Sequence, residues 1–204
     1  LVIYQTTRFA KAIITKPETI HVSYNHTPPR FLWNFSGEKM PGILGNFLSK
    51  LRLYDQIIAR SRVDYFLAGS ENCKERIKKI YHKGSKVLLP FVDLKEFKDI
   101  ESFDGGYYLI VARLNPYKRV DLAVAAFSKN EKKLIVVGNG PELSRLMENA
   151  GPNIRFLQNI YEDLLKNLYA GCRGLILTAE EDFGMTPLEA QALGKGIIAY
   201  KKGG

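Results

Sequence analysis

The 204-residue sequence is poor in cysteine, which bears on both metal and redox chemistry. Its two cysteines, Cys73 and Cys172, stand far apart, and neither has a second Cys or a His close by in the sequence. The pattern therefore predicts neither a structural zinc site nor a redox pair. Two unpaired cysteines suit a reducing compartment, so we expect a cytoplasmic protein.

Long apolar runs are also absent. The longest, such as Leu134–Gly138 and Gly174–Leu177, are far shorter than the roughly 20 residues that cross a bilayer. The first residues, Leu1–Tyr4, have neither an initiator Met nor a charged segment ahead of an apolar one, so they carry no information about targeting. We interpret them as a strand entered part-way, and we expect no segment of this sequence to span a membrane.

Positively charged residues, in contrast, are in excess. The formal net charge is +9, and such an excess predicts an anionic partner, whether a phosphate group, a nucleic acid or an acidic membrane surface. Charge alone chooses none of the three. The hydrophobic fraction of 46% is enough for a substantial core, so we expect a globular chain with one large domain or two small ones.

The second half of the chain alternates between two patterns. Short runs rich in Ile, Val and Leu are typical of buried strands and lie at Tyr107–Ala112, Lys133–Gly138, Asn153–Leu157, Arg173–Thr178 and Gly196–Tyr200. Between them, apolar residues recur at the three- and four-residue spacing of helices, at Val120–Ser128, Pro141–Asn149, Tyr161–Ala170 and Pro187–Leu193. This alternation predicts an α/β fold with a parallel, doubly wound sheet.

The first half is less regular. We expect strands at Ile20–Asn25, Val63–Ala68 and Lys86–Leu89, and helices at Gly45–Arg60 and Ser70–Tyr81. These elements resemble the back half of another α/β domain. We therefore divide the chain into a first domain over residues 1–95, a linker over residues 96–106 and a second domain over residues 107–204.

Two cations follow the first regular strand of the second domain. Arg113 and Lys118 stand five positions apart across a turn that contains a proline. Ligands of open α/β sheets bind beyond the carboxyl ends of the strands, so the two side chains can converge on one anion, and a diphosphate fits that arrangement. A solvated basic loop is the alternative.

The next strand ends in a glycine-rich turn. Gly138 and Gly140 permit close approach of the backbone to a ligand, and Pro141 suits the first position of a helix. Ordinary turns between a strand and a helix need glycine too, so the pattern is a weak signal of a nucleotide site.

The most specific stretch is Glu180–Ala190, which again comes straight after a buried strand. Backbone amides of Gly184, Met185 and Thr186 at the start of a helix suit a phosphate. Helix capping alone is the alternative. No Asp-x-Asp pair with apolar flanks is present in the sequence, so we expect no metal site.

Two glutamates frame this stretch with seven residues between them. Glu181 and Glu189 can each accept two hydrogen bonds from the hydroxyls of a sugar or ribose. Their spacing around Phe-Gly-Met-Thr-Pro resembles the signature of the retaining glycosyltransferases of family 4, which have the GT-B architecture of two Rossmann-like domains. Further landmarks of that family stand in the expected order at Pro90–Asp93, Arg113–Lys118 and Gly138–Pro141.

The resemblance implies transfer of a sugar with retention of configuration, from GDP-mannose to a glycan or a lipid-linked acceptor. The nucleotide sugar is a substrate, and no cofactor is implied. By resemblance, the diphosphate would be bound by Arg113, Lys118, Gly184, Met185 and Thr186, the donor sugar by Glu181, Phe183 and Gly184, and the nucleotide by Gly138, Gly140 and Glu189.

One further site residue comes from the first half. The stretch Tyr24–Trp33 contains His-Thr-Pro and is similar to a segment found in mannosyltransferases of surface polysaccharide assembly. That likeness implies that His26 lies near the transferred sugar, with Glu181 as the second catalytic residue. A structural or surface histidine is the alternative. Phe31 and Trp33 are core residues or platforms for acceptor sugars.

The sequence departs from the family at both ends, where members have further strands and helices. We therefore expect a partial chain, and whether these 204 residues are active by themselves stays open. Two other functions stay open: a nucleotide-sugar epimerase on the same scaffold, and a basic module for nucleic acid. Scattered cations without an RNA-binding signature argue against nucleic acid. The positive charge instead favours peripheral contact with the anionic inner face of a membrane.

Overall fold

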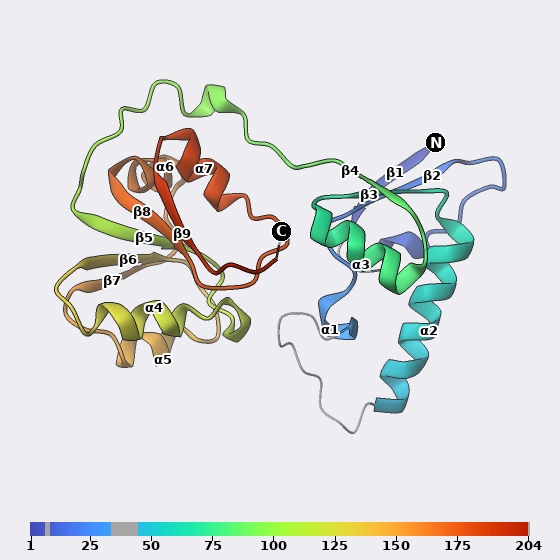
Figure 1. Ribbon diagram of the computed structural model, residues 1–204, viewed down its shortest axis with the longest axis horizontal. Coiled ribbons are helices and arrows are strands. Elements are labelled where there is room, and N and C mark those ends of the chain that lie inside the picture. Colours follow the sequence, from blue (N-terminus) through green and yellow to red (C-terminus); the bar gives the residue numbers. More distant parts are fainter. Residues whose placement is uncertain (7–8, 34–44, 204) are drawn as a thin grey trace. The chain divides into compact units, whose positions relative to one another are not determined.

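The computed structural model describes residues 1–6, 9–33 and 45–203, which fall into two compact units. Leu1–Pro90 form the first unit, which also includes Glu181–Phe183 and Gly203. Phe91–Glu180 and Gly184–Lys202 form the second. Each unit is a parallel sheet with helices (Figure 1).

The sheet of the first unit has four parallel strands in the order β1-β2-β3-β4. These strands are β1 (Val2–Thr6), β2 (His21–Asn25), β3 (Tyr65–Ala68) and β4 (Ser85–Val87). Every second residue of β2 is buried, and these buried residues are polar, which is unusual for a strand: His21, Ser23 and Asn25. Their side chains find hydrogen-bond partners inside the unit: Nδ1 of His21 lies 2.7 Å from the carbonyl oxygen of Arg62, and Nδ2 of Asn25 donates to Oγ of Ser23 over 2.9 Å.

The helices of this unit are η1 (Ala10–Ala12), α1 (Arg30–Trp33), α2 (Gly45–Arg62) and α3 (Glu71–Tyr81). The start of α3 is fixed by Ser70, whose hydroxyl accepts from the amide of Cys73 over 3.0 Å. Its end is fixed by His82 in the left-handed conformation, with φ of 54°. Apolar residues of α2, β3, α3 and the turn between α2 and β3 form the core: Ala59, Val63, Phe66, Ala68, Cys73, Ile77, Ile80 and Tyr81.

A buried ion pair lies at the edge of this core. Nζ of Lys11 is 2.6 Å from Oδ1 of Asp55, and both side chains are almost fully shielded from solvent. The other oxygen of Asp55 accepts from the hydroxyl of Tyr81 over 2.8 Å and from Nε1 of Trp33 over 3.0 Å. Trp33 therefore serves the packing of this unit, as the core alternative for the aromatic residues predicts.

The second unit has five parallel strands in the order β7-β6-β5-β8-β9. These strands are β5 (Tyr107–Val111), β6 (Lys133–Val137), β7 (Ile154–Leu157), β8 (Cys172–Leu177) and β9 (Gly196–Ala199). The chain moves from β5 outward to β7 and then returns to the other side of β5 with β8. The carboxyl ends of β5 and β8 therefore meet at the point where the strand order reverses, which is where α/β sheets bind ligands.

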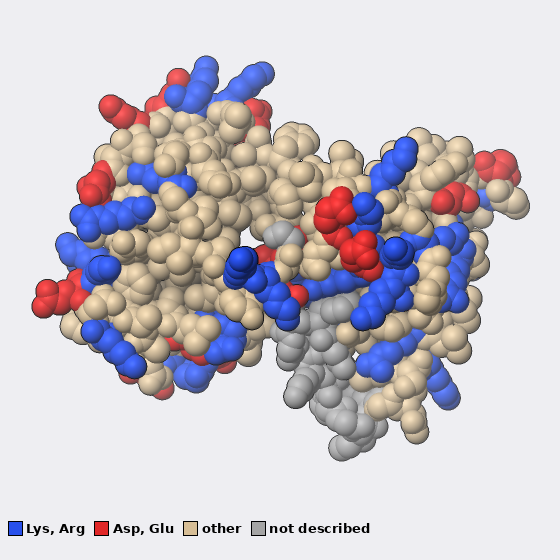
Figure 2. All heavy atoms as spheres, in the orientation of Figure 1, with Lys and Arg blue, Asp and Glu red and all other residues tan. Residues whose placement is uncertain are grey.

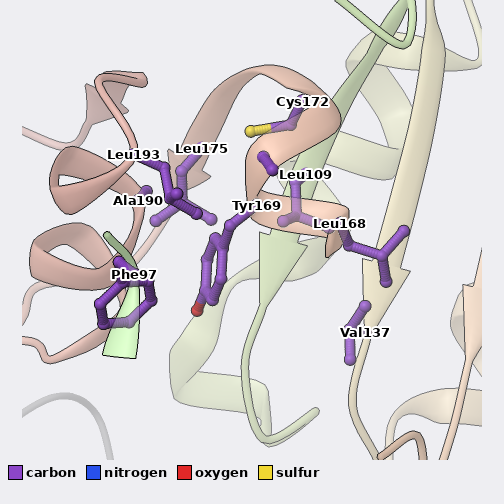
Figure 3. Packing of buried hydrophobic residues seen from close by; sticks show 10 residues of the cluster. Phe97, Leu109, Val137, Leu168, Tyr169, Cys172, Leu175, Ala190 and Leu193 are labelled. Atoms are coloured by element: carbon purple, nitrogen blue, oxygen red, sulfur yellow. The ribbon is translucent and has the colours of Figure 1, made fainter. Parts of the chain in front are cut away.

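Helices cover both faces of this sheet, as a parallel sheet requires (Figure 1). On one face α4 (Val120–Phe127) and α5 (Leu143–Glu148) pack against Ile110, Leu134 and Val136. On the other, α6 (Glu162–Gly171) and α7 (Thr186–Ala192) contribute Tyr169 and Ala190 to a core with Leu109 and Leu175 (Figure 3). The predicted α/β class with a doubly wound parallel sheet is confirmed.

Two boundaries differ from the sequence-based expectation. Residues 96–106 were expected to form a linker, but the second unit begins at Phe91, because the side chain of Phe97 is 7% exposed and packs with Tyr169 and Leu193 (Figure 3). Pro141 was expected at the first helical position, but α5 begins at Leu143. The amide of Glu142 donates to the carbonyl of Leu114 over 3.0 Å, which holds the preceding turn out of the helix.

None of the helices in the described ranges is long and apolar enough to cross a bilayer.

The buried ion pair gives a prediction for the stability of the first unit. Asp55→Asn keeps an acceptor for Tyr81 and Trp33 but removes the negative charge that lies 2.6 Å from the buried Nζ of Lys11, so we expect a loss of about 3–5 kcal/mol. Burial already lowers the pKa of Lys11, although Asp55 opposes the shift. The double variant Lys11→Met/Asp55→Asn removes both charges and should recover most of that loss. Denaturant unfolding followed by the fluorescence of Trp33, the single tryptophan, measures the free energy of unfolding of both variants. A double variant that is no more stable than Asp55→Asn would contradict this account.

Candidate functional site

The turns after β5 and β6 lie side by side at the carboxyl edge of the second sheet. Their hydrogen bonds continue the ladder of the strands: the amide of Ala112 donates to the carbonyl of Val137 over 3.0 Å, and that of Leu114 donates to Asn139 over 2.8 Å. Arg113 stands between these two bonded residues. Its backbone is therefore fixed on both sides.

Gly138 and Gly140 allow this close fit. A Cβ on Gly138, where φ is +151°, would lie 1.9 Å from the carbonyl oxygen of Ala112, and a Cβ on Gly140 would lie 2.5 Å from that of Leu114. No side chain can occupy that space, so the structure gives both glycines a role in packing one backbone against another. Their predicted contact with a nucleotide stays a prediction.

Lys118 is tied to the loop that follows β8. The 3-10 helix η5 (Pro116–Lys118) carries it, and its carbonyl accepts from the hydroxyl of Thr178 over 2.7 Å. Thr178 comes directly after Leu177, the last residue of β8. This bond joins the two loops that flank the point where the strand order reverses. Arg113 is exposed, and the Nζ of Lys118 lies 5.3 Å from the ring centroid of Tyr117.

The predicted phosphate-binding amides follow on the same loop. Gly184 has φ of +86°, Met185 is exposed, and Thr186 begins α7. The structure thus brings Arg113, Lys118, Gly138, Gly140, Gly184, Met185, Thr186 and Glu189 together in the second unit, on turns and a helix that follow β5, β6 and β8.

Glu189 is held by a residue that the sequence did not single out. The hydroxyl of Tyr169 donates to its Oε2 over 2.7 Å, from the centre of the core shown in Figure 3. Burial raises the pKa of Tyr169, and the neighbouring Glu189 raises it further. Tyr169 therefore stays a donor at neutral pH and fixes one carboxylate oxygen, which leaves the lone pairs of the other for hydroxyl groups.

The remaining predicted residues lie in the first unit. His26 follows β2, its ring packs edge-on against Tyr24 with centroids 5.2 Å apart, and its Nε2 is hydrogen-bonded to the side-chain amide of Gln5. Burial lowers the pKa of His26, and the carboxylate of Asp182 partly opposes that shift. The imidazole is therefore neutral at physiological pH, in the form that can both donate and accept a hydrogen bond.

Asp182 is the organising residue of this part of the first unit. It is 6% exposed. Its carboxylate accepts from Arg30 over 2.9 Å and from Asn72 over 2.8 Å, and it also pairs with Arg76. Arg76 in turn donates to the hydroxyl of Thr27 over 3.1 Å. Two guanidinium groups and an amide thus hold one buried carboxylate, which fixes the segment that carries Glu181 and Phe183.

The backbone of Glu181 packs closely against Gly203, with which it forms a parallel bridge. A Cβ on Gly203 would lie 2.0 Å from the carbonyl oxygen of Glu181. Glu181 and Phe183 are both half-buried in this unit. The structure therefore groups the predicted residues Glu181 and Phe183 with His26, through the contacts of Asp182.

Sequence reasoning missed Asp182, Asn72, Arg76 and Tyr169 as supports of the site. Asp182 offered a signal, since it stands between two residues that were singled out. The others offered no signal, because each lies in an ordinary helical pattern. The partner of Asn72 and Arg76 is more than a hundred positions away in the sequence, and the partner of Tyr169 is twenty positions away. Within the described residues no group of three or more His, Cys, Asp or Glu side chains is arranged to hold a metal ion.

Known proteins match this chain in sequence and in fold. The family model described as "Glycosyl transferases group 1" matches residues 93–204, more than half of the chain. The chain belongs to this family. A curated relative in this comparison, the GDP-Man:Man(3)GlcNAc(2)-PP-Dol alpha-1,2-mannosyltransferase of Mus musculus, is 31% identical over 147 residues, which are 59% of this chain and 30% of the relative.

Solved structures of glycosyltransferases share the fold. HepE of Anabaena, determined in complex with UDP-glucose, matches with a TM-score of 0.64 and 17% identity over 90% of this chain and 60% of its own. The lipopolysaccharide outer core galactosyltransferase WaaB matches with a TM-score of 0.62 and 18% identity, over 91% of this chain and 50% of its own. The chain thus has the GT-B fold and spans 30–60% of the length of these relatives.

The glycine turn gives a prediction for the second unit. Gly138→Ala adds a methyl group where the carbonyl of Ala112 lies and forces a positive φ on an L-residue, so we expect a loss of about 2–4 kcal/mol. Gly196→Ala is the matched control, because Gly196 has ordinary φ and open space around its Cα. Thermal unfolding followed by circular dichroism measures both variants. Equal melting temperatures of Gly138→Ala and Gly196→Ala would show that the turn accommodates a methyl group without loss of stability.

The titration of His26 gives a second prediction. Asp182 raises the pKa of His26 against the effect of burial, so Asp182→Asn should lower that pKa further, because it removes the negative charge that favours the imidazolium form. Glu71→Gln, an exposed acid of the same unit that pairs with Lys74, is the control and should leave the titration in place. NMR of the imidazole protons measures the change. An unchanged or higher pKa in Asp182→Asn would contradict the assignment.

Proposed function

We propose that this chain is the donor-binding part of a retaining glycosyltransferase that transfers mannose from GDP-mannose to a hydroxyl of a glycan or a lipid-linked acceptor. The observation that carries the proposal is the hydrogen bond from Thr178 to the carbonyl of Lys118. It joins the loops after β5 and β8 where the strand order reverses, so two cations and the start of α7 belong to one ligand-binding edge.

Arg113 and Lys118 bind the donor diphosphate in this proposal. Negative charge grows on the diphosphate as the bond to the sugar breaks, and fixed positive groups stabilise that charge more in the transition state than in the ground state. Arg113 offers a planar set of donors on a backbone that is held on both sides, whereas Lys118 offers a mobile point charge. Amides of Gly184, Met185 and Thr186 add neutral donors.

The two glutamates take different parts of the donor. Glu189, which Tyr169 fixes through one oxygen, accepts hydrogen bonds from the ribose through the other. Glu181 and Phe183 bind the donor sugar, and the neutral imidazole of His26 hydrogen-bonds to a sugar hydroxyl. The buried carboxylate of Asp182 keeps Glu181 in position, since its partners Arg30, Asn72 and Arg76 hold this short segment.

The mannosyl donor of this proposal is supported by one relative, and the nucleotide is not decided by the comparisons. The mouse relative is named for GDP-mannose as donor and a lipid diphosphate oligosaccharide as acceptor. HepE was determined with UDP-glucose, so proteins of this fold use more than one nucleotide. The wider family supports the type of reaction, and the mouse relative supports mannose.

Calorimetry with GDP on the complete protein tests the diphosphate site. Arg113→Ala and Lys118→Ala should each weaken GDP by roughly 10- to 100-fold, as expected for loss of a hydrogen bond to a charged group. Arg155→Ala and Lys133→Ala are matched controls, because both are exposed cations of the same sheet, on β7 and β6 away from this edge. An equal loss in all four variants would indicate general electrostatic attraction and remove the proposed site.

A thermal-shift panel of nucleotide sugars then identifies the donor. A ligand at 100 times its dissociation constant adds about 2.7 kcal/mol of stability, and we expect that shift with GDP-mannose. Product analysis with the complete protein shows whether mannose is transferred and with which anomeric configuration. If no nucleotide sugar shifts the melting temperature, GDP-mannose as donor has no support. If the donor is epimerised and no glycan product forms, the protein is an epimerase and not a transferase.

A further inference from the structure

Helix α2 has apolar residues on two sides. Leu48, Ile58 and Ala59 are buried and face the rest of the first unit. Four large apolar side chains are exposed instead: Phe47 (58%), Leu53 (59%), Tyr54 (52%) and Ile57 (53%). A surface helix normally has one apolar side, and a second, exposed one indicates a binding surface.

The exposed residues form one continuous face. Phe47 and Tyr54 are seven positions apart, which places them within about 20° of each other around the helix axis. Leu53 and Ile57 extend the same side by steps of three and four residues. We call Phe47, Lys50, Leu53, Tyr54 and Ile57 the outer face of α2, since Lys50 falls between the apolar residues and is itself exposed.

The contacts of α2 prevent this face from turning inward. On the opposite side, Nε of Arg52 donates to the carbonyl of Leu32 over 2.7 Å, and Nε2 of Gln56 donates to that of Ile80 over 2.8 Å. Near the end of the helix, Nε of Arg60 donates to the carbonyl of Tyr81 over 3.0 Å. The helix is thus fixed in rotation, and its outer face is part of the surface.

The exposed charged residues of α2 all have the same sign. Lys50, Arg60 and Arg62 are exposed. The single acidic residue between Gly45 and Arg62 is Asp55, which is buried and paired with Lys11. Figure 2 shows Lys and Arg side chains gathered over the part of the first unit where α2 lies in Figure 1.

We propose that the outer face of α2 docks onto an anionic lipid surface. Aromatic and aliphatic side chains on a helix that lies in the membrane plane enter the region between headgroups and acyl chains, while Lys and Arg reach anionic headgroups. Tyr54 suits this depth, because its ring is apolar and its hydroxyl can stay in water. A protein surface rich in acids would match the cations but not four adjacent apolar side chains.

Vesicle co-sedimentation of the complete protein tests this surface. Wild-type protein should bind vesicles of phosphatidylcholine with phosphatidylglycerol more tightly than phosphatidylcholine alone, and salt should weaken that binding. Phe47→Ser/Ile57→Ser should reduce binding by roughly tenfold or more. Lys50→Glu should reduce it by at least about fivefold.

The matched control is Leu122→Ser/Met147→Ser, which removes two apolar residues of the second unit with similar exposure, 48% and 51%. It should bind vesicles as the wild type does. Unchanged emission of Trp33, which is bonded to Asp55 of α2, shows that the first unit of each variant is folded. GDP binding should be the same in all variants, so a failure here leaves the donor site untouched.

Three results would overturn the proposal. The first is equal binding to neutral and anionic vesicles, or no binding at all. The second is wild-type affinity in the folded Phe47→Ser/Ile57→Ser variant. The third is a wild-type dimer in sedimentation that this variant dissociates, because the outer face of α2 would then bind a second copy of the chain.

Discussion

The close packing of two turns is the constraint on which the second unit depends. The backbone from Gly138 to Gly140 lies against that of Ala112 and Leu114 so closely that a Cβ at either glycine would overlap a carbonyl group. This contact holds Arg113 at the carboxyl edge of β5. The hydrogen bond from Thr178 to Lys118 extends the constraint to β8, and the candidate donor site is built on these two fixed loops.

Buried carboxylates play the corresponding part in the first unit. Asp55 holds Lys11, Tyr81 and Trp33 together, and Asp182 holds two arginines and an asparagine. A buried charge is costly unless cations and hydrogen-bond donors surround it. Each carboxylate therefore specifies one arrangement of its partners: the first sets the position of α2 and α1, and the second sets the position of the segment with Glu181.

The two kinds of constraint suit the functions that we propose. Binding a diphosphate needs cations on a rigid edge, because stabilisation of developing charge depends on groups that need not rearrange. Binding a sugar needs neutral donors and acceptors, and burial keeps His26 in that form. The outer face of α2 is free for another task, since contacts of Arg52, Gln56 and Arg60 hold the helix by its opposite side.

The sequence by itself determined the strands and helices of the second unit and the residues of the candidate edge. Buried parallel strands are continuous runs of Ile, Val and Leu, and motifs such as Arg113–Lys118 and Glu181–Glu189 are local in the chain. Only the tertiary structure decided the packing role of Gly138, the place of Phe97 in the second core and the support of Glu189 by Tyr169. Each of these depends on two segments that meet in space, and no local pattern records which segments will meet.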